Sequence, residues 1–244
     1  MHGQPAEIAV TPGQFVRRLL GERLFARVVE FYRAVFVDLD EVAACLPPLA
    51  PGSEILDVGG GDGALLERIL RRQPRLRASL VDLRPSVGLS LTDARRERVR
   101  LFASTAVRDC AGRGVPVPDV VVVADVLHHV PVAERTALLR DLRDFLSGPP
   151  RLLVVKEVAP ESWRARAGLW SDRYVTGDRH VALVAPDEVK SLVAEVFPDL
   201  AARDTPLLER DHPNYCILFE PSRADGATAG RGMDARELRN TSRS

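Results

Sequence analysis

The sequence predicts an α/β domain built on a doubly wound, mostly parallel β-sheet with helices on both faces. Short apolar runs alternate with helical patterns between residues 54 and 219, and this alternation is typical of parallel sheets. The run at 119–124 is almost entirely apolar, as expected for a strand covered on both faces. A cluster of glycines follows the strand at 54–58 and precedes a helix. Ligands of such sheets bind beyond the carboxyl ends of the strands, so we expect the functional site at that edge.

The segments follow one another in a regular order. Apolar residues at spacings of three and four predict helical structure over 14–46, which ends at the prolines and glycine of 47–52. The expected strands are 54–58, 78–81, 99–103, 119–124, 152–155 and 215–219, and the later helices are 64–72, 133–146 and 186–196. We therefore expect an N-terminal helical cap or lid at 1–50, one main domain at 51–220 and a polar, disordered tail at 221–244.

Composition narrows the class of protein. The chain has 244 residues and a formal net charge of zero, whereas proteins that bind nucleic acid in bulk usually carry a basic excess. Its three cysteines are widely spaced and odd in number, which fits a reduced, cytoplasmic protein better than a disulfide framework or a zinc site. No apolar run of about 18 residues and no signal-peptide core is present. We expect a soluble, unexported protein with neither a membrane nor a nucleic acid as its partner.

The glycine cluster reads Asp57-Val-Gly59-Gly-Gly61-Asp-Gly63. Glycines at a strand-to-helix junction let a ligand lie against bare backbone, although a tight turn alone would give the same pattern. A second carboxylate, Asp82, closes the next apolar run, and such a pair suits a ligand with an ammonium group and a ribose. No Gly-Lys-Ser/Thr follows, which excludes a P-loop. A nicotinamide dinucleotide is the competing ligand.

The stretch from Glu54 to Gly63 resembles motif I of class I S-adenosylmethionine (SAM)-dependent methyltransferases, particularly small-molecule O-methyltransferases. The resemblance covers roughly residues 53–220 and implies a seven-stranded sheet with SAM as cofactor. It implies that Asp57 anchors the glycine loop and the methionine ammonium, and that Asp82 accepts the ribose hydroxyls. The loop glycines that would admit the methionine part are Gly59, Gly61 and Gly63.

The adenine contacts follow from the same resemblance. Leu83 would pack against the adenine ring, and Ser104 and Thr105 would border its amino group. Related O-methyltransferases often have Gly-Asp-Met-Phe after the third strand, whereas this chain has Ala-Ser-Thr-Ala at 103–106. This is the position at which the chain departs most from the family.

A second motif follows the apolar strand at 119–124 and contains Asp125, His128 and His129. One interpretation is a strand and a helix start with a histidine that only caps or packs. The resembling O-methyltransferases carry Leu-His-Asn/Asp here and use the histidine as general base. The resemblance implies that role for His128, with His129 as the second candidate. We place Asp125 among the cofactor-binding residues. The segment lacks the Asn-Pro-Pro-Tyr of enzymes that methylate amino groups of DNA bases or protein glutamine.

A third region lies after the strand at 152–155. A polar segment with a glycine, near the carboxyl edge of the sheet, is a natural wall for a substrate, and its arginines suit a carboxylate or phosphate. An amphipathic helix whose tryptophans pack on the core is the alternative. The residues that we assign to substrate binding are Trp163, Trp170, Arg173, Tyr174, Arg179 and His180.

The N-terminal helical region contains Tyr32 and Arg33. It either covers one edge of the sheet or closes as a lid, with Tyr32 near the methionine carboxylate of the cofactor. Plant-type O-methyltransferases pair through N-terminal helices, which implies a homodimer, although their N-terminal domain is far longer. No acidic cluster spaced for magnesium is present, so we expect a reaction without metal.

Three functions remain open at this point. The first is methyl transfer from SAM to a hydroxyl, or an amine, of a small molecule such as a secondary metabolite. The second is methylation of RNA or protein, for which a basic face or an added binding domain would be the usual signature. The third is a non-catalytic domain that binds SAM. In the first, an in-line displacement is accelerated by positioning, and His128 removes the proton of a hydroxyl acceptor.

Overall fold

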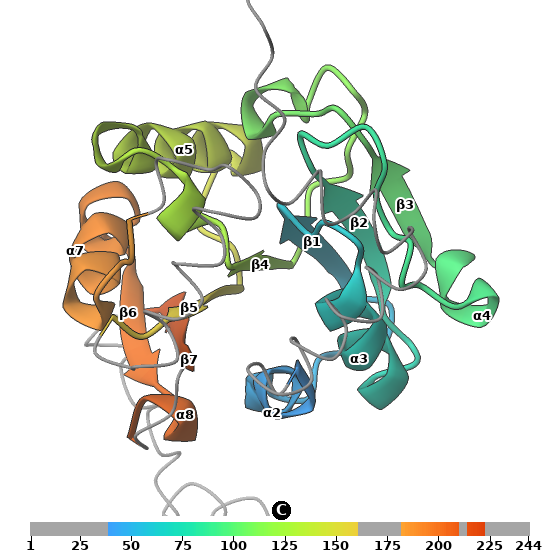
Figure 1. Ribbon diagram of the computed structural model, residues 1–244, viewed down its shortest axis with the longest axis horizontal. Helices are drawn as coiled ribbons and strands as arrows, with labels where there is room; N and C mark the ends of the chain where they lie inside the picture. Colours follow the sequence, from blue (N-terminus) through green and yellow to red (C-terminus); the bar gives the residue numbers. More distant parts are fainter. Residues whose placement is uncertain (1–38, 161–181, 210–213, 223–244) are drawn as a thin grey trace, which may run out of the picture.

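The computed structural model describes residues 39–160, 182–209 and 214–222. These residues form one seven-stranded sheet with helices on both faces (Figure 1). The strands are β1 (Glu54–Val58), β2 (Arg77–Val81), β3 (Val99–Phe102), β4 (Val120–Ala124), β5 (Leu152–Val158), β6 (Leu200–Asp204) and β7 (Asn214–Pro221). The helices are α2 (Leu39–Cys45), α3 (Ala64–Arg72), α4 (Asp93–Arg96), α5 (Val132–Leu146), α7 (Pro186–Val196) and α8 (Pro206–Glu209), with 3₁₀ turns η1 (Val107–Asp109) and η2 (Leu127–His129).

The strand order is β3-β2-β1-β4-β5-β7-β6. Strands β1 to β5 pair in parallel, whereas β7 runs antiparallel to both of its neighbours, β5 and β6. The chain reverses its direction of winding between β1 and β4, and ligands of open α/β sheets bind at such a switch point. The predicted fold class, a doubly wound and mostly parallel sheet, is confirmed.

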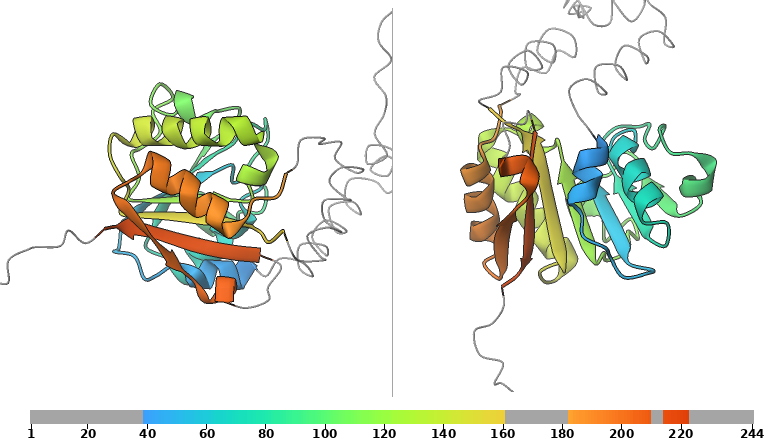
Figure 2. Two further views of the ribbon diagram at one scale, coloured as in Figure 1. Left: turned by 90° about the vertical axis from the view of Figure 1, so that its left-hand side faces the viewer. Right: turned by 90° about the horizontal axis from the view of Figure 1, so that it is seen from below.

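Strand β4 shows how the sequence separates the two hydrophobic layers. Val121 and Val123 join the core that contains α5 and α7, whereas Val120 and Val122 join the core that contains α2, α3 and α8. Successive side chains of a strand point to opposite faces, so an unbroken valine run buries both. Figure 2 shows the two helical layers on either side of the sheet.

The functional edge of the sheet is built by the loops that leave neighbouring strands. The glycine loop 59–63 follows β1, and the segment 125–131 follows β4, which pairs with β1 in parallel. Carboxyl ends of parallel strands meet at one edge, and the two loops therefore lie next to each other.

Several boundaries differ from the sequence prediction. Strand β5 continues to Val158, through two charged residues that the apolar pattern does not include. Strand β6 is absent from the prediction because only Leu200 of its five residues is buried, so it has neither an apolar run nor a clear alternation. Of the helical region predicted at 14–46, α2 falls within the described residues. Most of the predicted cap and tail, residues 1–38 and 223–244, lies outside them.

Two further properties were expected from the sequence. The thiols of Cys45, Cys110 and Cys216 are all free. Within the described ranges, no helix has the length and apolar character needed to cross a bilayer.

Candidate functional site

The glycine loop has a backbone shape that side chains would block. Gly59, Gly61 and Gly63 all have positive φ angles, of 66°, 56° and 79°, a region that residues with a Cβ rarely adopt. A Cβ at Gly59 would lie 2.6 Å from the Val126 side chain. The amide of Gly59 donates to the Val81 carbonyl at 2.7 Å. The loop is therefore pressed against the segment that follows β4.

Asp57 is the penultimate residue of β1, just before this loop. Its side chain is buried, and no hydrogen bond from the described residues reaches its Oδ2. Burial, and to a lesser extent the charges of Asp82 and Asp62, raise the pKa of Asp57 to about 7. A Cβ at Gly60 would lie only 2.3 Å from Asp57 Oδ2, so the second glycine is also required. A buried carboxyl with an unpartnered oxygen is well suited to a cationic ligand.

Asp82 lies at the end of the neighbouring strand β2 and organises two loops. Its Oδ2 accepts a hydrogen bond from the Gly61 amide at 2.8 Å, and its Oδ1 accepts one from the Arg84 amide at 2.7 Å. Each carboxylate oxygen has a second lone pair for a further donor. Leu83, which follows it, is 74% exposed, as an adenine-stacking residue would be before its ligand binds.

The predicted adenine-side residues occupy the turn after β3. Ser104 is exposed and has a φ of 49°. Thr105 is buried, its amide donates to the Asp82 carbonyl at 3.0 Å, and its hydroxyl donates to Ala103 O at 2.9 Å. Both residues therefore lie beside Asp82, but the Thr105 hydroxyl already has a backbone partner.

His128 forms a close pair with Glu157, which extends from β5. The His128 Nδ1 lies 2.5 Å from the Glu157 Oε2, and both side chains are buried. Burial by itself lowers the pKa of His128, but the hydrogen bond and the charge of Glu157 outweigh it, so the pKa is raised above its usual value. An imidazole whose Nδ1 is held by a carboxylate presents its Nε2 to a reacting group. The pair has the form of a general base and its orienting partner.

The end of β5 also contacts Asp125, which lies just before the turn that carries His128. The Lys156 Nζ lies 2.6 Å from both carboxylate oxygens of Asp125, and the Asp125 amide donates to the Lys156 carbonyl at 2.9 Å. Asp125 has a φ of 57°, and its side chain is 36% exposed. We predicted a contact between Asp125 and the cofactor; in the structure, its carboxylate is paired with Lys156.

Arg135 braces the His128 turn from helix α5. Its guanidinium is buried and donates to the backbone oxygens of Leu127, Val130 and Ala182, and it also pairs with Glu188 at 2.6 Å. The Ala182 amide in turn donates to His128 O at 2.9 Å. The turn that carries His128 is thus fixed from α5, from β5 and from residue 182.

His129 differs from His128 in its surroundings. Its side chain is exposed, and its ring lies 4.1 Å from the His128 ring between centroids. Of the two predicted histidines, His128 has the buried carboxylate partner that favours a role as base.

A metal ion has to be considered at this cluster. Asp125, His128 and Glu157 each bring one ligand-type atom within 4.8 Å of the others. The Lys156 ammonium already neutralises Asp125, and Glu157 accepts hydrogen bonds from the Val126 and Leu127 amides. The arrangement therefore favours proton transfer over cation binding. A reaction without metal stays a prediction.

Several predicted residues fall outside the described parts of the chain. They are the lid residues Tyr32 and Arg33 and the substrate residues Trp163, Trp170, Arg173, Tyr174, Arg179 and His180. Conversely, sequence reasoning missed Glu157, Arg135 and Gly60 as contributors to the site. A signal did exist for Glu157, because charged residues directly after a buried apolar run are costly unless they have partners.

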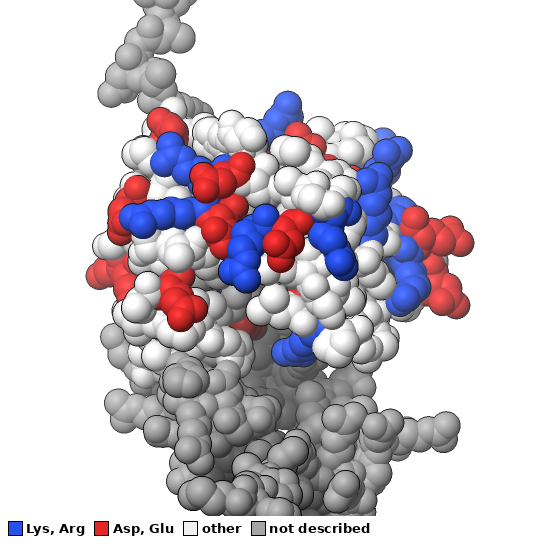
Figure 3. Space-filling view, turned by 90° about the horizontal axis from the view of Figure 1, so that it is seen from above, with Lys and Arg blue, Asp and Glu red and all other residues white. Residues whose placement is uncertain are grey.

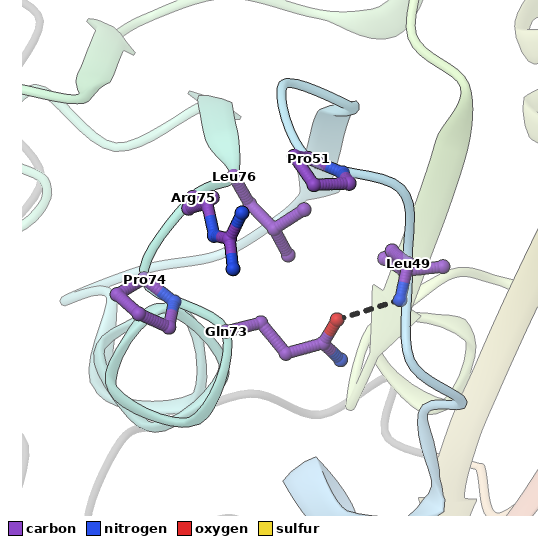
Figure 4. Close-up of a pocket in the computed structure, with 6 residues that line it drawn as sticks. All are labelled: Leu49, Pro51, Gln73, Pro74, Arg75 and Leu76. Atoms are coloured by element: carbon purple, nitrogen blue, oxygen red, sulfur yellow. Dashed lines mark hydrogen bonds between the residues drawn. The ribbon is translucent and has the colours of Figure 1, made fainter.

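One described pocket lies away from this edge. It has a volume of about 190 Å³ and is lined by Leu49, Pro51, Gln73, Pro74, Arg75 and Leu76 (Figure 4). Gln73 accepts a hydrogen bond from the Leu49 amide across it at 2.8 Å. Its lining residues precede β1 and β2, at the amino ends of these strands, whereas the glycine loop follows the carboxyl end of β1.

Comparison with known families identifies the class of protein. The model of the methyltransferase domain family matches residues 26–196, which include the glycine loop, Asp82 and both histidines. The chain belongs to the methyltransferase domain family. The match confirms the methyltransferase class that motif I resembles.

Two curated relatives share part of their length with this methyltransferase. A phenazine O-methyltransferase of Lysobacter antibioticus is 30% identical over 153 residues, which are 59% of this chain and 42% of the relative. A release factor glutamine methyltransferase of Koribacter versatilis is 24% identical over 176 residues, which are 69% of this chain and 61% of the relative. The chain therefore spans less than two thirds of each.

Solved structures share the fold of this methyltransferase. An O-methyltransferase family 2 protein of Planctomyces limnophilus, in complex with apigenin, has a TM-score of 0.60 at 23% identity, covering 89% of this chain and 67% of that one. An O-methyltransferase from neocarzinostatin biosynthesis, in complex with SAM and a hydroxynaphthoic acid, has a TM-score of 0.56 at 20% identity, with coverages of 82% and 57%. Similarity at this level establishes the fold.

Proposed function

We propose that the protein transfers the methyl group of SAM to a hydroxyl group of a small molecule, such as a secondary metabolite. The observation that carries this proposal is the buried His128–Glu157 pair, 2.5 Å apart, directly beside the glycine loop. Val126 lies between the two parts of the site, because it touches Gly59 and precedes the turn that carries His128. A proton acceptor and a cofactor loop in contact are what methylation of a hydroxyl requires.

The residues present fit SAM. Asp57 would hold the methionine ammonium, because its buried Oδ2 has no partner among the described residues. Asp82 would accept the ribose hydroxyls through its remaining lone pairs, and the exposed Leu83 would cover the adenine. The glycine loop removes side chains from the methionine path. SAM, when bound, supplies an electrophilic methyl group on its sulfonium.

The chain's own groups would handle the acceptor and its proton. Glu157 fixes the ring of His128 by its bond to Nδ1 and holds the backbone of the turn through the Val126 and Leu127 amides. His128 Nε2 would take the hydroxyl proton as the oxygen bonds to the methyl carbon. The buried Glu157 carboxylate would stabilise the resulting imidazolium. Holding the acceptor in line would supply most of the acceleration.

The described residues on either side of the segment to which we assign the substrate lie at this site. Residues 161–181 begin shortly after β5, whose end carries Lys156 and Glu157. They are followed by Ala182, whose amide bonds to the His128 carbonyl. This placement supports the proposal that the segment selects the acceptor.

Methylation of a protein or RNA is the second candidate, favoured by the similarity to a release factor glutamine methyltransferase. The chain has Ala-Asp-Val-Leu at 124–127, beginning with the last residue of β4, instead of the Asn-Pro-Pro-Tyr of glutamine-methylating enzymes. On the face shown in Figure 3, acidic side chains are interspersed among the basic ones, whereas a protein that binds a phosphate backbone usually presents a basic face. Both observations favour the small-molecule acceptor.

The proposal is tested by offering the protein isotopically labelled SAM together with pools of hydroxylated metabolites, total RNA and cell protein. We expect the label in the metabolite fraction, in a product whose new methyl group is bonded to oxygen. Label in RNA or protein would establish the second candidate. SAM binding without transfer to any pool would favour the non-catalytic domain.

Changing Asp82→Ala is expected to weaken SAM binding by roughly 100-fold, because ribose hydroxyls and the Gly61 amide lose a charged acceptor. Calorimetric titration measures this effect. The exposed Asp144 on α5 provides a control of equal charge, since Asp144→Asn should bind SAM as the natural protein does. Equal affinities of Asp82→Ala and the natural protein would refute the ribose assignment.

A further inference from the structure

Two consecutive residues at the end of β5 hold four consecutive residues after β4. Lys156 binds Asp125 through both its carbonyl and its ammonium. Glu157 accepts from the amides of Val126 and Leu127, and it contacts the ring of His128. The Lys156–Glu157 dipeptide therefore determines where the imidazole lies, and it places a positive and a negative charge beside that ring.

Lys156 occupies an unusual position for a charged residue. Its side chain is 1% exposed, and a buried ammonium is tolerated only with close partners. The chain contains 34 lysines and arginines, of which only Lys156 and Lys190 are lysines. The compact ammonium of Lys156 lies equally close to both Asp125 oxygens, at 2.6 Å.

We propose that Lys156 is a positioning residue that neutralises Asp125 and thereby keeps the neighbouring His128 imidazole free to accept a proton. The inference rests on the proposed role of His128 as general base. Without Lys156, two carboxylates, those of Asp125 and Glu157, would act on one imidazole, since the ligand-type atoms of all three groups lie within 4.8 Å. An imidazole that stays protonated at neutral pH does not act as a base.

The charges that surround His128 act in opposing directions. Burial lowers the pKa of His128, the hydrogen bond and charge of Glu157 raise it, Asp125 also raises it, and Lys156 lowers it. The Arg135 guanidinium approaches from α5, and Tyr215 of β7 pairs with Glu157 in the sheet register. The His129 ring lies nearby, tilted by 43° to that of His128. The Lys156 and Asp125 contributions oppose each other, so the intact pair leaves burial and Glu157 as the main influences on this pKa.

The test is an NMR titration of the full chain with ¹⁵N-labelled histidine, which needs no substrate or cofactor. The chain has five histidines, and loss of one signal in His128→Gln assigns that of His128. In Lys156→Met, we expect the His128 pKa to rise by roughly 0.5 to 1 unit, because Asp125 becomes an unopposed negative charge. In Asp125→Asn, we expect it to fall, because the Lys156 charge is then unopposed. The double variant should titrate close to the natural protein.

Lys190 provides the matched control, because its ammonium also pairs with an aspartate, Asp204, at 2.9 Å, but on the surface. Lys190→Met should leave the His128 titration unchanged. The inference is overturned if Lys156→Met titrates as the natural protein does, or if the double variant shifts as far as Lys156→Met. Should one single variant fail to fold, the direction of shift in the other decides: a shift opposite to the one stated, or none, overturns the inference.

Activity supplies a second measurement that separates this inference from the proposed function. The acidic limb of the pH profile of kcat/KM should move upward in Lys156→Met by the same amount as the NMR pKa. A shifted NMR pKa in a protein that methylates no hydroxyl would support the electrostatic role and refute the proposed reaction. An unchanged NMR pKa in a protein that does methylate a hydroxyl would support the proposed reaction and overturn the electrostatic role of Lys156.

Discussion

The variant Asp57→Asn should be more stable than the natural protein at pH 8 when no ligand is bound. The pKa of this buried carboxyl rises from 3.8 to about 7 on folding, so the folded state holds its proton more tightly than the unfolded state. Stability is therefore lost as the pH increases from about 4 to about 7, by up to about 4 kcal/mol at higher pH. Asparagine removes this loss, but its buried amide costs about 1–3 kcal/mol for lack of a partner.

The net gain at pH 8 should be roughly 1–3 kcal/mol. Near pH 4, where the natural carboxyl is protonated as well, the difference should change sign, because only the cost of the buried asparagine amide remains. Calorimetric melting of both proteins across this pH range measures the difference in their free energies of unfolding. The titration of all other groups is common to both proteins and cancels in this difference. A variant that melts below the natural protein at pH 8 would contradict the assigned burial of charge.

The same variant should bind SAM more weakly, because an ammonium gains most from an ionised carboxylate. In the natural protein, SAM affinity should increase between pH 6 and pH 8 as Asp57 loses its proton, and binding at pH 6 should release that proton to the buffer. Calorimetry in buffers of different ionisation enthalpy measures the proton directly. Asp57→Asn should release none. The expected combination of greater stability and weaker binding is characteristic of residues kept for function.

Replacing His128 by glutamine should lower kcat by about 10²- to 10⁴-fold while SAM binding is retained. Glutamine keeps a polar group near Glu157 but accepts no proton at neutral pH. Since the pKa of His128 is raised by the Glu157 hydrogen bond and charge over the opposing effect of burial, the rate in the natural enzyme should increase with pH through a value above 6.5. Glu157→Gln should move this limb to lower pH.

The adjacent His129 gives the decisive comparison. Its ring is exposed and lies 4.1 Å from that of His128, so His129→Gln alters the same neighbourhood. A greater loss of kcat in His129→Gln than in His128→Gln would assign the base to His129. A pH-independent rate in the natural enzyme would point to an acceptor that needs no base, such as an amine.

Much of the fold can be predicted from the sequence because its sheet is buried on both faces. The valines of β4 must be apolar at every position, since alternate side chains enter opposite cores, and such runs stand out. Strand β6 could not be recognised, because it lies at the sheet edge with four exposed residues. Its existence depends on pairing with β7, which is a tertiary effect.

The site divides in a similar way. The glycine loop and Asp82 lie close together in the sequence, and the backbone conformation of the loop requires glycine. Their pattern can therefore be recognised from the sequence. Glu157 and Arg135 act on a turn that lies 30 and 8 residues away from them, and only the folded chain brings them together. Lys156 and Glu157 do leave one trace, a pair of charges directly after a buried apolar run.

The hydrogen bond between Ala182 and His128 has an evolutionary consequence. The described chain leaves this edge of the sheet after β5 and returns to it at Ala182, whose amide donates to the His128 carbonyl and whose own carbonyl accepts from Arg135. Strand β5 and Ala182 are both held by bonds to the turn that carries His128, so changes in the length or composition of the sequence between them would leave the His128–Glu157 pair in place. Different acceptor preferences would then evolve through changes in this one segment, while the glycine loop and the His128–Glu157 pair are retained.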